Sequence, residues 1–265
     1  IEVGIFLAWC VPNFGKFQQI AQKTTRYGKL QDMRVTVEGN QVYLSLEYTT
    51  GDAAGQNMVT LATEAVCAYI VEHAPVKPRR WFVESNLSGD KKATALSYLS
   101  VRGKKVTAEA LIPRATLTRY LHTKPETMQE YWKMSFVGGV QSGSIGVQGH
   151  YANGLAALFI ACGQDVACVA EAAMGITRVE LRENGDFYIA VTLPNLIVGT
   201  VGGGTGLPTQ HECLAMMGCT GPGTARKFSE ICAAVILAGE LSIMAAMAAG
   251  QFAEAHRRYG RTSHR

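Results

Sequence analysis

One short segment combines an acid with two amines, a set that could act on a carbonyl group. Asp90, Lys91 and Lys92 follow one another in a stretch with loop character. Such a triplet is usually a solvated turn. In a cleft, however, a buried lysine with an aspartate neighbour can stabilise an oxyanion and donate a proton. From the triplet alone, both interpretations stay open.

Four other polar side chains could take part in chemistry. His150 and Asn153 are spaced to share one face of a helix, and Asp165 ends the same apolar stretch. Buried polar groups of this kind must find hydrogen-bond partners. His256 follows a run of small residues and lies among arginines. A histidine at a helix end is more often a solvated group favoured by the helix dipole than a catalyst.

Two glycine-rich segments could approach a ligand closely. Residues 51–60 read GDAAGQNMVT, where strand character gives way to helix. An N-cap at Asp52 followed by a turn is favoured there over phosphate binding at the helix N-terminus. The segment is not GxGxxG, so it does not indicate a Rossmann fold. Residues 199–206 read GTVGGGTG, which is typical either of a loop around a ligand or of closely crossing backbones.

The elements that must position these residues fall into two groups. In the first, apolar periodicity predicts helices over 4–25 and 52–73, and period-2 alternation predicts a hairpin of 34–37 with 41–48. Residues 80–83 read as a further strand. This order is typical of a split βαβ, ferredoxin-like domain that lacks its first strand, so we expect the chain to start in mid-domain.

The second group begins near residue 83. We predict two short strands within 101–112, a long apolar helix over 142–164, a hairpin over 179–193 and a long helix over 228–259. The predicted fold class is therefore α+β. It has a small ferredoxin-like domain over 1–82 and a larger α+β domain over 83–265 with a long central apolar helix.

Composition limits the class of protein. The 265 residues are 48% hydrophobic and 17% charged, which predicts a folded chain. A net charge of +4 without a basic run argues against a dedicated nucleic-acid binder. The seven cysteines form no CxxC pair, so we expect no metal site and buried free thiols in a reducing, cytoplasmic compartment.

One stretch is long enough to cross a bilayer. Residues 232–250 read CAAVILAGELSIMAAMAAG. Glu240 lies in the middle, and alanine and glycine outnumber leucine, isoleucine and valine. Because a charge at the bilayer centre is costly, a small-residue helix buried inside the protein is favoured, with no membrane span in this chain.

In combination, these segments resemble one family. Their order and their sequences are similar to those of 3-hydroxy-3-methylglutaryl-CoA (HMG-CoA) reductases, from about Thr24 to Arg261. The segments that carry the resemblance are 51–58 (GDAAGQNM), 90–92 (DKK), 161–165 (ACGQD), 199–205 (GTVGGGT) and 237–246 (LAGELSIMAA), with His256. The Gly-Gln-Asp sequence at 163–165 resembles the eukaryote and archaeal class of these reductases rather than the bacterial degradative class.

The resemblance implies an activity and roles for three residues. The family reduces (S)-HMG-CoA to mevalonate and CoA with two hydrides from NADPH, through a hemithioacetal and an aldehyde. Lys91 would stabilise the oxyanion, Asp165 would pair with this lysine and tune its proton affinity, and His256 would protonate the departing CoA thiolate.

The resemblance also implies binding residues and a partner. The implied NADPH contacts are Thr25, Arg26, Asp52, Gln56, Asn57, Met58, Val201, Gly202 and Arg261. Among them, Thr25 and Arg26 would bind the 2′-phosphate. The resemblance therefore implies that 1–82 is an NADP-binding domain. The implied substrate contacts are Ser85, Asn86, Asp90, Lys92, Lys133, His150 and Asn153. Active sites shared between subunits imply a homodimer or a higher homo-oligomer.

Several positions depart from the family's pattern. The chain has no Thr-Thr-Glu-Gly motif with the family's catalytic glutamate, which we expect in an upstream segment. Glu84 replaces a serine, Ala255 replaces the serine before His256, and Lys133 is one place from the active-site lysine. Alternatives are therefore a reductase of another acyl-CoA and a non-catalytic NADPH-binding homologue. Retention of Lys91, Asp165 and His256 argues against the second alternative.

Overall fold

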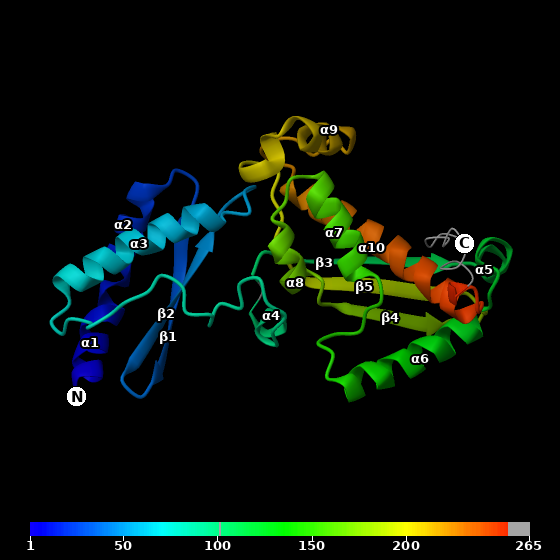
Figure 1. The fold of residues 1–265 in the computed structure, drawn as a ribbon, viewed down its shortest axis with the longest axis horizontal. Helices are drawn as coiled ribbons and strands as arrows, with labels where there is room; N and C mark the ends of the chain where they lie inside the picture. The colour runs from blue at the N-terminus through cyan, green and yellow to red at the C-terminus, as the bar shows by residue number, and fades with distance from the viewer. Residues whose placement is uncertain (101, 254–265) are drawn as a thin grey trace, which may run out of the picture. The chain divides into compact units, whose positions relative to one another are not determined.

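The computed structural model describes residues 1–100 and 102–253, which form a mixed α/β fold (Figure 1). The chain divides into two compact units, Ile1–Asp90 and a second that begins at Lys91. Each is described by itself. The predicted residues His256 and Arg261, and the departure at Ala255, lie outside the described residues.

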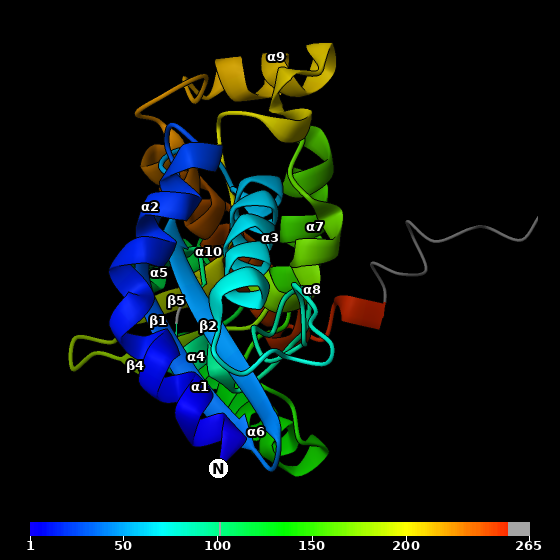
Figure 2. The same ribbon diagram turned by 90° about the vertical axis from the view of Figure 1, so that its left-hand side faces the viewer.

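In the first unit, helices pack against a two-stranded antiparallel hairpin (Figures 1 and 2). Its elements are α1 (Glu2–Cys10), the 3-10 turn η1 (Val11–Asn13), α2 (Phe14–Thr24), β1 (Lys29–Glu38), β2 (Gln41–Thr49) and α3 (Gln56–His73). Phe17 and Ala21 on α2, Leu30 on β1, and Val66 and Ile70 on α3 are buried in one core. The helices therefore cover one face of the hairpin with their apolar stripes.

Two predictions for this unit need correction. The predicted helix 4–25 is interrupted at Val11–Asn13, because Pro12 lacks the N–H that a continuous α-helix needs. Residues 80–83 form no strand, and Trp81 and Phe82 are exposed. A strand is stable only when its backbone pairs with a neighbour, and no strand pairs with this segment within the described residues. The predicted hairpin is confirmed, with Glu38 paired to Gln41 across the turn.

The second unit contains a three-stranded antiparallel sheet with the order β3-β5-β4. Its strands are β3 (Lys104–Ile112), β4 (Ile176–Leu181) and β5 (Phe187–Leu196), and its helical elements are α4 (Leu96–Leu99), α5 (Arg114–Leu121), α6 (Pro125–Ser142), α7 (Tyr151–Ala161), η2 (Val166–Cys168), α8 (Val169–Ala172), η3 (Gly203–Gly206), α9 (Pro208–Met216) and α10 (Ala225–Ala248). The central strand β5 is almost wholly buried, because α10 packs across it.

Helix boundaries in this unit differ from the predicted ones. In place of one helix over 142–164, α6 ends at Ser142 and α7 begins at Tyr151. Gly143 and Gly146 between them have φ of +73° and +101°, a backbone conformation that ends an α-helix. The described residues 102–112 hold one strand rather than two, and α10 begins at Ala225 and ends at Ala248. The predicted hairpin over 179–193 is confirmed by β4 and β5.

Helix α10 is the described helix that is long and apolar enough to span a bilayer, a test that core helices of globular proteins also pass. Its Glu240 side chain is only 3% exposed. The carboxylate accepts hydrogen bonds from the N–H groups of Gly149 and His150 and from the Thr177 hydroxyl. A charge satisfied in this way ties α10 into the core of the unit, as the sequence favours.

Candidate active site

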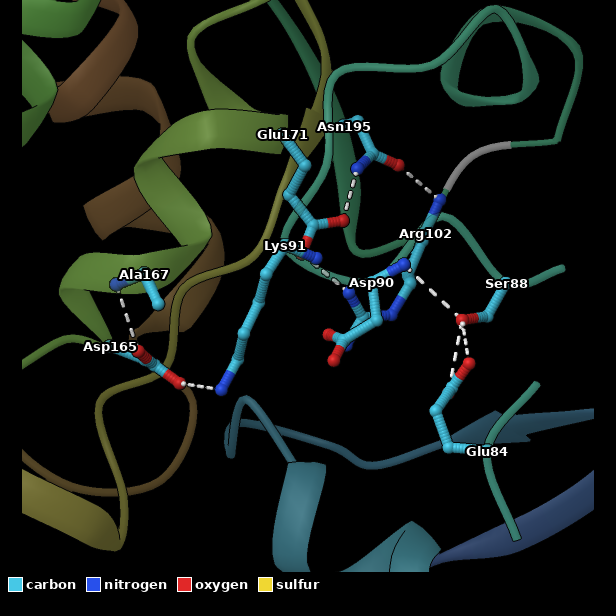
Figure 3. A network of polar contacts seen from close by, with 9 residues as sticks. All are labelled: Glu84, Ser88, Asp90, Lys91, Arg102, Asp165, Ala167, Glu171 and Asn195. Atoms are coloured by element: carbon cyan, nitrogen blue, oxygen red, sulfur yellow. Dashed lines mark hydrogen bonds and ion pairs between the residues drawn. The ribbon is translucent and has the colours of Figure 1, made fainter. Parts of the chain in front are cut away.

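Lys91 and Asp165 form an ion pair (Figure 3). Lys91 Nζ lies 3.0 Å from Asp165 Oδ2, and the two side chains are 39% and 34% exposed. Asp165 Oδ1 accepts the Ala167 N–H at 3.0 Å, so the carboxylate also caps η2 and is fixed in orientation. A pair this exposed contributes roughly 0–1 kcal/mol to stability. The pair therefore contributes little to the stability of the fold.

The backbone of Lys91 is held in an unusual conformation. Its φ is +57°, in the left-handed region, which disfavours a non-glycine residue by roughly 1–2 kcal/mol. The Lys91 N–H donates a 2.9 Å hydrogen bond to Glu171 Oε1. This contact joins residues 80 positions apart. Tertiary structure thus stabilises the lysine in a conformation that its local sequence disfavours.

Glu171 is the centre of a buried polar cluster (Figure 3). Its side chain is 1% exposed, and Oε1 also lies 2.5 Å from Arg102 Nη1. Asn195 Nδ2 donates to Glu171 Oε2 at 2.9 Å, while Asn195 Oδ1 accepts the Arg102 N–H at 2.6 Å. The carboxylate is therefore compensated by a cation and by fixed donors, as a buried charge requires.

The loop that precedes Lys91 contains three predicted substrate residues, Ser85, Asn86 and Asp90. Its hydrogen bonds centre on Glu84, whose carboxylate accepts the Asn86 N–H and the Ser88 hydroxyl. Ser88 Oγ in turn accepts the Asp90 N–H at 3.2 Å. Glu84 therefore shapes the loop in which these predicted residues lie.

The glycine-rich loop is tied to the Asp165 turn. Gln164 Oε1 accepts the Gly199 N–H at 2.8 Å, and Gln164 Nε2 donates to the Gly199 carbonyl at 2.9 Å. A Cβ built on Gly163 would lie 2.3 Å from the Gly204 carbonyl oxygen. The backbone at Gly163 therefore crosses close to the backbone at Gly204, which explains why position 204 is a glycine. Gly202 has a φ of +77°, and a Cβ there would meet no described atom within 4 Å, which leaves open space beside the predicted contact residues Val201 and Gly202.

In the first unit, the predicted NADPH residues Thr25 and Met58 lie together. Thr25 Oγ1 accepts the N–H groups of Tyr27 and Gly28 at 3.2 and 3.0 Å. A Cβ on Gly28 would meet Met58 Sδ at 2.6 Å, so this turn lies close against α3 and a larger residue would require the Met58 side chain to move. Arg26 is exposed at the turn.

The segment 51–58 forms the start of α3. The helix begins at Gln56, and its N-cap is Gly55 with a φ of +82°. The prediction of an N-cap at Asp52 is therefore wrong. A glycine is required at the cap because a Cβ there would meet the Thr50 side chain at 2.3 Å. Gln56 and Asn57 consequently lie in the first turn of the helix.

His150 and Asn153 lie at the start of α7. His150 is the N-cap residue, and its ring packs against Gly239, where a Cβ would be 2.0 Å from Nδ1. Asn153 is exposed, and so is Lys133 on α6. An open cavity of about 380 Å³ lies beside this segment, with Ala93, Ser144, Gln148, Tyr151, Ala152 and Met174 in its wall. Burial raises the pKa of the Tyr151 hydroxyl above its usual value.

Metal chemistry finds no support in the described part of the chain. No group of three or more histidine, cysteine, aspartate or glutamate side chains is placed there to hold a metal ion. The buried thiol Cys162 adjoins the Gly163-Gln164-Asp165 turn, and burial raises its pKa to about 11. It is therefore a neutral thiol near pH 7.

Comparison with known proteins decides the family. The family model described as hydroxymethylglutaryl-coenzyme A reductase matches residues 2–261. The chain belongs to the hydroxymethylglutaryl-coenzyme A reductase family.

Relatives within the reductase family include archaeal enzymes. The 3-hydroxy-3-methylglutaryl-coenzyme A reductase of Pyrococcus abyssi is 45% identical over 261 residues, which cover 96% of this chain and 64% of the relative. The corresponding reductase of Methanocaldococcus jannaschii is 40% identical over 260 residues, which again cover 96% of this chain and 64% of the relative. The chain thus spans just under two thirds of these relatives. The class II reductase of Streptococcus pneumoniae, solved with NADPH in open conformations, has a similar fold, with a TM-score of 0.66, 19% identity and coverage of 92% of this chain and 67% of that one.

The family resemblance predicted Lys91 and Asp165, but not the residues that hold them. Glu171, Arg102, Asn195 and Gln164 were all missed as site residues. Two signals were present in the sequence: Glu171 interrupts the apolar stretch 166–174, and Asn195 is the penultimate residue of the apolar strand β5. A polar residue in such a position must find a partner, yet the sequence does not say which partner.

Proposed function

We propose that this protein reduces (S)-HMG-CoA to mevalonate and CoA, consuming two NADPH and two protons. The observation that carries the proposal is the Lys91–Asp165 pair, with Nζ 3.0 Å from Oδ2 and the lysine in a left-handed turn. Membership of the reductase family supports it.

Lys91 has the properties that the reduction of a thioester requires. When hydride reaches the carbonyl carbon, the carbonyl oxygen becomes negatively charged. A cation held in place before the reaction stabilises that charge more than mobile water does. Asp165 anchors the ammonium group, so that Lys91 points in one direction instead of sampling many rotamers. The same cation would act on the carbonyl of the aldehyde in the second reduction.

CoA leaves when the hemithioacetal collapses to the aldehyde. The leaving thiolate has an ordinary pKa of about 8.5, so a protonated imidazole near pH 7 is a suitable donor. We assign this proton transfer to His256, on the family resemblance alone.

The Thr25–Gly28 turn and the start of α3 have groups suited to binding NADPH, which would supply the hydride. The Thr25–Gly28 turn lies against Met58, and the exposed guanidinium of Arg26 offers a fork of donors suited to the 2′-phosphate. The first turn of α3 holds Gln56 and Asn57, at the positive end of the helix dipole, which favours the negative charge of a phosphate. Asp52 precedes that turn, Val201 and Gly202 would contact the cofactor from the glycine-rich loop, and Arg261 completes the predicted set.

The acyl group is assigned to the cavity of about 380 Å³. Ala93, two residues after Lys91, and Ala152, next to Asn153, are in its wall. The proposed substrate contacts are Ser85, Asn86, Asp90, Lys92, Lys133, His150 and Asn153. All of these side chains are polar or charged, and they could form hydrogen bonds or ion pairs with the hydroxyl and carboxylate of the hydroxymethylglutaryl group.

The remaining features of the proposal concern organisation. We assign the small unit to a ferredoxin-like, NADP-binding domain over 1–82 and the rest to a substrate-binding domain over 83–265. We assign the protein to the eukaryote and archaeal class, which the Gly-Gln-Asp sequence and the identities of 40–45% to archaeal relatives support. The family resemblance supports a homodimer or higher homo-oligomer with shared active sites, and the free cysteines support a cytoplasmic location.

The test is an assay with HMG-CoA and NADPH that follows NADPH oxidation and identifies the product. We expect two NADPH consumed per mevalonate, and a fall in kcat of about 100- to 1000-fold in Lys91→Ala. Lys105→Ala, which removes an exposed lysine of β3, should keep normal turnover. The assay is run on this chain and on the chain joined to a relative's segment carrying the upstream glutamate. No mevalonate from either form would refute the proposal.

A reductase of another acyl-CoA thioester is the second candidate. Glu84 favours it, because this carboxylate replaces the family's serine and accepts hydrogen bonds from Asn86 and Ser88. Turnover of other acyl-CoA thioesters together with none of HMG-CoA would select this candidate.

A further inference from the structure

We propose that Glu171 is a positioning residue of the reaction: its carboxylate, held by Arg102 and Asn195, sets the backbone of Lys91 and thereby the place of the ammonium group. The inference rests on the proposed function, because it concerns the lysine that would stabilise the oxyanion. Glu171 itself contacts the Lys91 backbone, so its effect on the reaction would pass through that lysine.

The contact geometry supports a directed role. Lys91 has its amide 2.9 Å from Glu171 Oε1 and its ammonium 3.0 Å from Asp165 Oδ2. The two carboxylates bracket one short helical segment, in which Asp165 caps η2 and Glu171 lies in α8. Both ends of the lysine are therefore held by the same segment. A shift of the backbone end would move the charged end relative to the substrate carbonyl.

The orientation of Asn195 is determined by its neighbours. Its Oδ1 accepts the Arg102 N–H at 2.6 Å, so its Nδ2 must face Glu171 Oε2, at 2.9 Å. The opposite amide orientation would place oxygen against the carboxylate and N–H against N–H. Asn195 is fully buried, so water cannot correct a mismatch. The cluster accordingly tolerates one arrangement of donors and acceptors, which makes it rigid.

This arrangement allows a rescue experiment. Glu171→Gln keeps an oxygen for Lys91 and Arg102, but it turns an NH2 group toward the NH2 of Asn195. In the double variant Glu171→Gln/Asn195→Asp, the new amide NH2 at position 171 faces a carboxylate oxygen, and the other oxygen of that carboxylate still accepts the Arg102 N–H. Every hydrogen bond is restored, and the negative charge is moved from one side chain of the cluster to its neighbour.

We expect Glu171→Gln to lower kcat by about 100-fold, the effect of a displacement of about 1 Å in a catalytic group, with the KM for NADPH changed less than about twofold. The double variant should regain most of the lost kcat. Glu109→Gln, an exposed carboxylate of β3 that accepts the Tyr188 hydroxyl, should leave kcat unchanged. Val191→Ala, a buried truncation in β5, gives the effect of lost stability alone.

A second readout does not depend on activity. The Lys91 amide hydrogen should exchange slowly with solvent in the parent protein, faster in Glu171→Gln and slowly again in the double variant. If neither this chain nor the form joined to the upstream segment makes mevalonate, the proposed function fails, while this exchange pattern still tests the contact.

The inference would be overturned by a normal kcat in Glu171→Gln, or by a loss no larger than that in Val191→Ala at equal stability. An unchanged exchange rate of the Lys91 amide would overturn it as well. If Glu171→Gln does not fold, the double variant decides: a folded double variant with a kcat near that of the parent supports the positioning role, and one with a kcat as low as that of Lys91→Ala contradicts it.

Discussion

Asp165 and Glu171 bind opposite ends of one lysine. Asp165 Oδ2 lies 3.0 Å from the Lys91 ammonium nitrogen, and Glu171 Oε1 lies 2.9 Å from the Lys91 backbone nitrogen. The first contact is partly exposed, while Glu171 is 1% exposed. The exposed contact is available to a substrate, and the buried one resists competition from water. The two contacts should therefore respond differently to substitution.

Replacing Asp165 by asparagine should separate chemistry from stability. In Asp165→Asn, Oδ1 still caps the Ala167 N–H, but the amide no longer anchors the ammonium of Lys91. Because the pair is partly exposed, we expect a loss of less than about 1 kcal/mol in the free energy of unfolding, measured by urea titration. In the same variant, kcat for mevalonate formation should fall by about 100-fold. A large loss of stability with normal kcat would show that the pair serves the fold.

Arg26 should determine the preference for NADPH over NADH. Charge-assisted hydrogen bonds to a phosphate are worth roughly 1.5–3 kcal/mol. Arg26→Ala should therefore lower kcat/KM for NADPH by about 10- to 150-fold and leave kcat/KM for NADH unchanged. Lys16→Ala, an exposed cation of α2, is the matched control. Equal losses with both cofactors would contradict a contact between Arg26 and the 2′-phosphate.

The crossing of Gly163 and Gly204 should be sensitive to a single methyl group. Gly163 has a φ of +65°, and a Cβ there would lie 2.3 Å from the Gly204 carbonyl oxygen. Gly163→Ala should lower the free energy of unfolding by roughly 2–5 kcal/mol, the sum of backbone strain and overpacking. In the same glycine-rich loop, a Cβ on Gly206 meets no described atom within 4 Å. Gly206→Ala should change stability by less than about 1 kcal/mol, and similar effects of the two substitutions would argue against close crossing.

Stability should fall at alkaline pH because of a buried thiol. Burial raises the pKa of Cys232 from 9.0 to about 12, so above pH 9 the unfolded chain loses this proton while the folded chain keeps it. The unfolded state is then favoured by about 1.4 kcal/mol per pH unit until the pH reaches the folded pKa. Urea titrations of the parent protein and of Cys232→Ala between pH 8 and 10.5 measure the difference. Parallel curves for the two proteins would show that Cys232 makes no such contribution.

Local signals in the sequence determined much of the secondary structure and the family. The turns at Gly39-Asn40 and Asn184-Gly185 predicted both hairpins, because residues at such turns adopt conformations that depend mainly on their own type. Ordered motifs predicted the reductase family, and within it the pairing of Lys91 with Asp165. These features needed no knowledge of distant contacts.

Tertiary structure decided the helix boundaries and the surroundings of the lysine. Apolar residues on both sides of 143–150 suited one helix, and only the packed chain shows α6 and α7 as separate helices. Glu171 contacts Lys91 from 80 residues away, and Asn195 contacts Arg102 from 93 residues away. No local preference encodes such pairs. They form because burial forces each polar group to find a partner among the residues that the fold brings near.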